Sequence, residues 1–218
     1  MVTELCRERI SSYDDNNARW RLANSVLYDM VSNHPSHTDE NEIVMKMWFI
    51  GRTYAAAIER RPNKAETTGD FYYDHVAPKL IGSEIDAKID SLRKYHTITA
   101  DNLPIILSVH KYLMGLFYDL TTKEKRSLAS KYLHFHLPEL FFIYDSRVAS
   151  VITQFAGKKD RKLNIPESVD RTYADFCYKA LLMYNELSGV YSDPKTRVID
   201  NILLRFCDEN ALPSNDEE

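Results

Sequence analysis

The chain has 218 residues, of which 44% are hydrophobic and 28% are charged, and its net charge is −4. This is enough apolar material for the core of a globular domain. It has no run of about 18 apolar residues and no apolar stretch in its charged N-terminus, so we expect a cytoplasmic protein with neither a membrane span nor a secretory signal. Six glycines and eight prolines are few for an all-β protein with many tight turns.

The residues that commonly bind metals or form disulfides are scattered. Cys6, Cys177 and Cys207 are far apart and odd in number, so we expect free thiols that fill core space. His134 and His136 lie two positions apart, on different sides of a predicted helix, and do not have the spacing of a metal-binding pair. There is no glycine-rich phosphate loop. The sequence therefore predicts no metal and no cofactor.

Apolar residues recur at helical spacing through most of the chain. The predicted helices cover, in chain order, residues 18–31, about 39–61, 71–80, 83 to about 95, 103–120, about 123–136, 145–157, about 168–188 and about 196–209. The apolar run LFFIY is too short to found a sheet. We predict an all-α protein of about eight or nine helices, packed as an orthogonal bundle.

Two of these helices form a helical hairpin, because only Thr121 and Thr122 separate 103–120 from the helix that follows. The hairpin region covers roughly residues 100–156. We expect a single domain over residues 1–212, or two packed helical subdomains, and a disordered tail at 213–218.

Lys131 lies at the border of the apolar face of the second hairpin helix. It is either partly desolvated, which lowers its pKa and frees the amine for nucleophilic attack, or it keeps its charge in water. Asp145 follows 14 positions later, as an ordinary helix cap or a catalytic carboxylate. An eight-residue connector that spans up to about 3.3 Å per residue allows the two side chains to meet.

A helical hairpin, a lysine on its second helix, a short Pro-containing connection and an aspartate that opens the next helix occur here in that order. This order resembles the helix-hairpin-helix DNA glycosylase superfamily, in particular its 8-oxoguanine glycosylase branch. The matching residues are Lys131 in ASKYLHF and Asp145 in IYDSRV. The chain departs from the family at the hairpin turn, where residues 120–124 (LTTKE) contain no glycine.

The resemblance implies that the protein binds DNA and cleaves the N-glycosidic bond of a modified or damaged base. Lys131 would attack the sugar C1′ and form a Schiff base, and Asp145 would stabilise the developing positive charge. The flipped base would enter a pocket lined by aromatic side chains. A glycosylase-like fold retained only for DNA binding is a further alternative.

Positive charge gathers between Thr121 and Lys162. This segment has nine bases and four acids, so its net charge is +5 and that of the remaining chain is −9. Such a segment is more often a solvated face, and the alternative is a surface that holds DNA phosphates. The candidate DNA-binding residues are Lys123, Lys125, Arg126, Arg147, Lys158, Lys159, Arg161 and Lys162.

A second feature is the segment WFIGRTYAAAIERRPN, in which Arg52 and Glu59 share one side of the predicted helix. They would form an ion pair that is either structural or seated in a cleft. In the second case, we expect Arg52 to face the segment that begins at Tyr144. The candidate pocket residues are Arg52, Tyr54, Glu59 and Tyr144.

An interpretation from a different functional class is a non-enzymatic all-α module. It would bind a protein or DNA within a bacterial accessory or defence system. Detection of a Schiff base at Lys131 would distinguish the enzyme interpretation from that of a non-enzymatic module.

Overall fold

The computed structural model describes residues 1–14, 18–59, 69–157 and 166–210. Within these ranges the regular structure is entirely helical, which confirms the all-α prediction. The elements are α1 (Glu4–Ser11), α2 (Ala18–Asn33), α3 (Glu40–Thr53), the π-helical turn η2 (Tyr72–Val76), α4 (Ala77–Ile81), α5 (Ile85–Leu92), α6 (Leu103–Thr121), α7 (Arg126–His136), α8 (Ser146–Ala156), α9 (Arg171–Glu186) and α10 (Lys195–Glu209).

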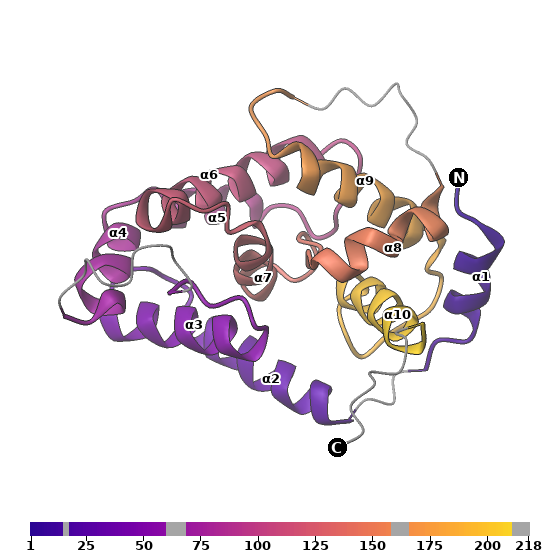
Figure 1. The fold of residues 1–218 in the computed structure, drawn as a ribbon, viewed down its shortest axis with the longest axis horizontal. Coiled ribbons are helices and arrows are strands. Elements are labelled where there is room, and N and C mark those ends of the chain that lie inside the picture. The colour runs from indigo at the N-terminus through magenta and orange to yellow at the C-terminus, as the bar shows by residue number, and fades with distance from the viewer. Residues whose placement is uncertain (15–17, 60–68, 158–165, 211–218) are drawn as a thin grey trace, which may run out of the picture.

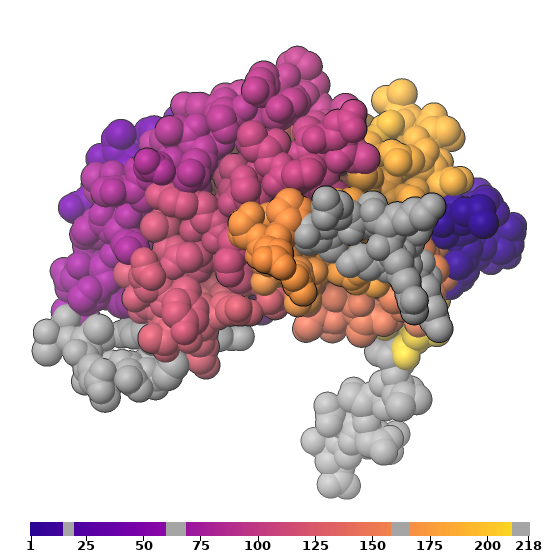
Figure 2. Space-filling view, turned by 90° about the horizontal axis from the view of Figure 1, so that it is seen from above, coloured from indigo at the N-terminus to yellow at the C-terminus, as the bar shows by residue number. Residues whose placement is uncertain are grey.

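The helices pack as two groups, one on each side of α7. Helix α7 contacts α2, α3 and α6, whereas α8 packs on α1, α9 and α10. Figure 1 shows α7 near the middle, with α2 and α3 on one side and α8 and α10 on the other. Helices α1 and α4 lie at opposite ends of the long axis in both views (Figure 1, Figure 2). One hydrophobic cluster includes Ile50 and Phe117 of the first group and Phe155 and Leu203 of the second, so the two groups share a core.

Helix α1 is an element that the apolar spacing did not predict. Thr3 caps it by accepting the backbone N–H of Cys6 at 3.3 Å. The N–H of Thr3 in turn donates to the carbonyl of Phe155 at 2.8 Å, which ties α1 to the end of α8. Cys6 and Cys177 are buried free thiols, and Cys207 is partly exposed.

No helix in the described part of the chain is both long enough and apolar enough to cross a membrane.

Helix α3 ends at Thr53, so the prediction of a helix that continues to about residue 61 was wrong. Ala55 adopts a left-handed conformation with φ of 51°, and the N–H of Ala56 donates to the carbonyl of Gly51 at 2.8 Å. This is the helix-ending pattern in which glycine is usual at the left-handed position. A side chain at position 51 would place its Cβ 3.1 Å from Cα of Ala57, so Gly51 allows the chain to fold back closely.

The α6–α7 hairpin forms without a glycine because Thr122 takes the left-handed conformation, with φ of 55°. Its N–H donates to the carbonyl of Tyr118 at 2.7 Å, and its hydroxyl donates to the carbonyl of Thr121. The N–H of Lys123 donates to the hydroxyl of Thr121 at 3.3 Å. These two backbone N–H groups are therefore engaged within the turn and are not offered to a phosphate.

Candidate active site

The connector between α7 and α8 sets the position of the site. Its run Leu140–Ile143 is buried, which pins the chain against the core. Three side chains also hold its backbone: His134 Nδ1 pairs with the carbonyl of Phe141 at 2.9 Å, Tyr173 donates to the carbonyl of Phe142 at 2.7 Å, and the N–H of Tyr144 donates to Ser130 at 3.0 Å. This fixed path brings the chain back from α7 and places Asp145 at the start of α8.

Lys131 is buried, and its side chain is only 3% exposed. Its Nζ donates to Ser127 Oγ at 2.8 Å, to the backbone carbonyl of Tyr54 at 3.4 Å and to Asp145 Oδ2 at 3.5 Å. Burial lowers the pKa of Lys131 below its ordinary value, and the charge of Asp145 offsets this only in part. The amine can therefore lose its proton more readily than that of a solvated lysine.

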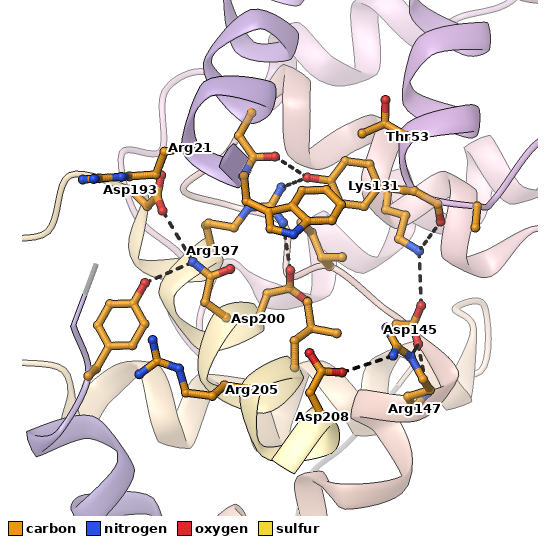
Figure 3. Close-up of a pocket in the computed structure, with 18 of the residues that line it drawn as sticks. Arg21, Thr53, Lys131, Asp145, Arg147, Asp193, Arg197, Asp200, Arg205 and Asp208 are labelled. Atoms are coloured by element: carbon orange, nitrogen blue, oxygen red, sulfur yellow. Dashed lines mark hydrogen bonds and ion pairs between the residues drawn. The ribbon is translucent and has the colours of Figure 1, made fainter. Parts of the chain in front are cut away.

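Asp145 serves as the N-cap of α8, and its Oδ1 accepts the backbone N–H of Arg147 at 3.0 Å. Partial burial opposes ionisation of this carboxyl, but the N–H of Arg147 and the charges of Lys131 and Arg147 outweigh it. The pKa of Asp145 therefore lies below its ordinary value. The helix cap and the partner of the lysine are thus the same ionised carboxylate (Figure 3).

Two residues of α10 complete the charged interior. Arg197 and Asp200 have side chains that are 2% and 3% exposed, and Arg197 Nη1 donates to Asp200 Oδ2 at 2.8 Å. Burial raises the pKa of Asp200, and the charges of Arg197 and Lys131 oppose this rise. Arg197 Nη2 also donates to the hydroxyl of Tyr54 at 2.6 Å.

These side chains line a cleft of about 840 Å³ between the two groups of helices. Figure 3 shows Lys131 and Asp145 directed toward one another at the cleft and Asp200 on the α10 side. The rings of Trp20 and Tyr54, 6.0 Å apart, give the cleft an aromatic surface. The lining residues are Tyr13, Asp14, Trp20, Arg21, Asn24, Thr53, Tyr54, Ala55, Lys131, Ile143, Asp145, Arg147, Asp193, Arg197, Asp200, Asn201, Leu204, Arg205, Asp208 and Glu209.

The candidate DNA-binding residues differ in how free their side chains are. Lys123 is exposed, and Arg147 is 62% exposed, with carboxylates of Asp145 and Asp208 at 3.5 Å. Lys125 is partly buried and donates to the carbonyl of Ala57 at 3.2 Å.

Arg126 is engaged in the fold. Its Nε and Nη2 donate to both carboxylate oxygens of Asp170 at 2.6 and 2.8 Å, and Nη2 also donates to Glu124. Its guanidinium lies 5.6 Å from the centre of the Tyr144 ring. The remaining candidates, Lys158, Lys159, Arg161 and Lys162, lie outside the described residues.

Of the four candidate pocket residues, Tyr54 lines the cleft. Arg52 and Glu59 do form an ion pair, and Tyr72 also donates to Glu59, but neither member of the pair is among the lining residues. Because α3 ends before Glu59, the fold-back at Ala55 forms this pair, and helical spacing does not. Tyr144 packs on the rings of Tyr173 and Phe176, also away from the cleft lining.

Within the described ranges, no group of three histidine, cysteine, aspartate or glutamate side chains is arranged to hold a metal ion.

Sequence reasoning missed Trp20, Arg197 and Asp200. The signal for the last two is the segment TRVID at the start of the predicted helix 196–209, where an arginine and an aspartate at i and i+3 flank apolar Val198 and Ile199. A charged pair on the apolar face of a helix indicates a buried ion pair. Trp20 carries no comparable signal, since a tryptophan on an amphipathic helix is usually part of the core.

Comparison with protein-family models, with curated proteins and with solved structures finds no match for this chain. The resemblance to the DNA glycosylases therefore depends on the order and geometry of its own residues.

Proposed function

We propose that this protein acts on DNA as a glycosylase-like enzyme that cleaves the N-glycosidic bond of a modified or damaged base. The observation that carries the proposal is the approach of Lys131 Nζ to within 3.5 Å of Asp145 Oδ2 in a cleft of about 840 Å³. An amine with a lowered pKa beside an ionised carboxylate is a suitable pair for nucleophilic displacement at an electrophilic carbon.

In the proposed reaction, the neutral amine of Lys131 forms a bond to C1′ of the nucleotide. The bond from C1′ to the base nitrogen breaks, and the base leaves with that electron pair and takes up a proton. The carboxylate of Asp145 stabilises the positive charge that develops on the sugar. Opening of the sugar ring then gives a Schiff base between Lys131 and C1′, which borohydride reduces to a stable amine.

The charge of the cleft agrees with entry of a single nucleotide rather than a stretch of backbone. Its lining contains six carboxylates and five cationic side chains, a balance that does not attract a polyanion. The aromatic rings of Trp20 and Tyr54 offer a surface for stacking of a flipped base. Under this proposal, the phosphates stay outside the cleft and meet exposed basic side chains such as Lys123, which is not among the lining residues.

Borohydride trapping tests the proposal. Purified protein is incubated with duplexes that contain an abasic site or one of a broad panel of modified bases, and a covalent adduct is sought by mass. We expect an adduct at Lys131 that is lost in Lys131→Ala and retained in Lys111→Ala, which changes an exposed lysine on α6 outside the cleft. If no duplex gives an adduct, or if the adduct still forms in Lys131→Ala, the proposed enzymatic activity of Lys131 is refuted.

A second candidate is the non-enzymatic module that binds a partner protein. Leu22 and Val26 of α2 are 69% and 58% exposed, and Trp48 and Phe49 of the neighbouring α3 are 42% and 47% exposed. Exposed apolar side chains on adjacent helices favour a protein-binding surface. Absence of any trapped adduct together with loss of partner binding in Val26→Lys would support this module instead.

A further inference from the structure

A buried ion pair lines the cleft together with Lys131. Arg197 and Asp200 come from α10, whereas Lys131 comes from α7, and all three line the same cleft. Replacing a buried ion pair by apolar residues of similar volume is often neutral or stabilising. Stability alone therefore does not account for two nearly inaccessible charges at this place.

Tyr54 connects the ion pair to the lysine. Arg197 Nη2 donates to its hydroxyl at 2.6 Å, and Lys131 Nζ donates to its backbone carbonyl at 3.4 Å. The guanidinium carbon of Arg197 and the Nζ of Lys131 lie 5.2 and 5.7 Å from the centre of its ring. The hydroxyl also donates to Asn24 of α2. One residue, through its hydroxyl, its ring and its carbonyl, thus contacts two cations of different helices and fixes them relative to one another.

The turn that follows Tyr54 has an unusual backbone conformation. Ala55, the next residue, is in the left-handed region, which is unfavourable for a residue other than glycine. The hydrogen bond from Ala56 to Gly51 and the contact of Tyr54 with Arg197 hold this turn. The turn aims the carbonyl of Tyr54 at Lys131.

The groups around the amine act on its charge in opposite directions. Burial and the nearby Arg197 favour the neutral amine, whereas Asp145 and Asp200 favour the ammonium. Only the neutral form is a nucleophile. Because Arg197 and Asp200 act with opposite sign, the charge of Lys131 depends on both members of the pair.

Two tyrosines and a histidine on or next to the surrounding helices are neutral near pH 7. Burial raises the pKa of Tyr28 on α2 and of Tyr54 after α3, and it lowers the pKa of His134 on α7 well below its ordinary value. Tyr28 and His134 also share a hydrogen bond of 2.7 Å. Arg147 pairs with Asp145 and Asp208 at the rim. The charges that shift the pKa of Lys131 are those of Asp145, Asp200 and Arg197.

We propose that Arg197 and Asp200 are positioning residues for Lys131: they hold it through Tyr54 and set the balance between its neutral and charged forms. The inference builds on the proposed function, since it assigns roles to residues behind the same nucleophile. Neither residue needs to touch the DNA.

The charge part is tested by the pH dependence of borohydride trapping on abasic-site DNA. In Asp200→Asn, the cation of Arg197 remains without its counter-charge, so the midpoint of the trapping profile moves to lower pH, by at least about half a unit. In Arg197→Met, the midpoint moves to higher pH. Either variant alone is decisive if the other fails to fold. A midpoint equal to that of the wild type overturns the inference.

The matched control is Asp170→Asn. Asp170 is also a buried carboxylate paired with an arginine, Arg126, but it lies outside the cleft lining. It should lose stability as Asp200→Asn does, with no shift of the trapping midpoint. If both variants shift the midpoint equally, general loosening of the fold explains the effect and the inference is wrong.

The positioning part is tested by Tyr54→Phe, which removes the hydroxyl that Arg197 contacts and keeps the carbonyl that Lys131 contacts. We expect the trapping rate on the alkaline plateau to fall by about tenfold, because a misplaced nucleophile reacts slowly, with an unchanged midpoint. A wild-type plateau rate would remove Tyr54 from the proposal.

A measurement without DNA separates this inference from the proposed function. The Cε resonance of Lys131 in lysine-labelled protein, assigned by its absence in Lys131→Met, is titrated in the wild type and in Asp200→Asn. A lower titration midpoint in Asp200→Asn supports the inference even if no DNA adduct forms, in which case the glycosylase proposal alone fails. An unchanged midpoint overturns the inference whatever the outcome of trapping.

Discussion

The hydroxyl of Tyr28 lies 2.7 Å from His134 Nε2, and this contact determines how His134 supports the connector beside the candidate site. His134 Nδ1 faces the carbonyl of Phe141, which can only accept a hydrogen bond, so the ring proton is on Nδ1 and Nε2 accepts from Tyr28. A neutral histidine of this tautomer links α2 to the α7–α8 connector, which ends at Asp145. Protonation of His134 would break the link to Tyr28 or require the hydroxyl to turn.

The first prediction concerns acid stability. Burial lowers the pKa of His37 to about 4 and of His110 to about 3, and it holds the pKa of His134 and His136 well below the ordinary value. In the unfolded chain these groups take up protons near pH 6.5. The free energy of unfolding should therefore fall as the pH drops below about 6.5, by up to about 1.4 kcal/mol per pH unit for each histidine that stays neutral in the folded state.

Urea unfolding at pH 7, 6 and 5 measures this slope, and His110→Phe is the matched variant. The variant keeps an aromatic ring against Tyr173, whose ring centre lies 3.7 Å from that of His110, and it loses one titrating group. The slope of its free energy of unfolding against pH should be smaller by the contribution of one histidine, up to about 1.4 kcal/mol per pH unit. Asp200 and Glu139, whose pKa values burial raises, titrate in both proteins and cancel in the comparison. Equal slopes in the two proteins would contradict the conclusion that His110 stays neutral in the folded protein.

The second prediction separates the two roles of Asp145. Asparagine caps helices about as well as aspartate, so Asp145→Asn should be more stable than Asp145→Ala by about 1 kcal/mol. Both variants leave the buried Lys131 without its counter-charge, so this difference measures the cap alone. Both variants remove the charge beside Lys131, so both should slow trapping on abasic-site DNA by at least about tenfold. Urea unfolding and trapping rates are measured on the same preparations. Wild-type trapping by Asp145→Asn would assign this residue to capping alone.

The third prediction contrasts two basic residues of the α6–α7 region. Lys123→Ala should weaken DNA binding and reduce its dependence on salt, with unchanged stability, because the side chain is exposed. Arg126→Ala should cost about 2 kcal/mol or more, because it leaves the buried Asp170 without its partner. Fluorescence anisotropy with labelled duplex at several salt concentrations and thermal unfolding measure the two effects. DNA binding by Lys123→Ala that equals that of the wild type at every salt concentration would show that the exposed lysine has no part in DNA binding.

Local patterns predicted much of the fold because they depend on neighbouring residues. The apolar spacing of α2 and α6 and the cap at Asp145 were sufficient to place these elements. The length of the connector allowed Lys131 and Asp145 to meet but did not require it, and the structure shows the contact. The end of α3 was not predictable in this way, since nothing in the segment AAAIERR marks Ala55 for a left-handed conformation.

The features that the sequence did not predict depend on contacts between residues that are distant in the chain. The sequence predicts Arg126 as a phosphate ligand because its partner in the fold, Asp170, lies 44 positions later in the chain. The bond between Tyr54 and Arg197 joins residues 143 positions apart. Burial of such charges depends on the packing of whole helices, which periodicity along one segment does not contain.

The fourth prediction concerns the hairpin turn without glycine. Thr122 is left-handed, so Thr122→Gly should relieve backbone strain and stabilise the protein by about 0.5–1 kcal/mol, or roughly 1–4 °C in Tm. Thr122→Ala is the control, because it also removes the hydroxyl bond to Thr121 but keeps the strain. It should be slightly less stable than the wild type, so the difference between the two variants measures the strain itself. Thermal unfolding by circular dichroism gives both values, and a glycine variant no more stable than the alanine variant would show that this turn stores no strain.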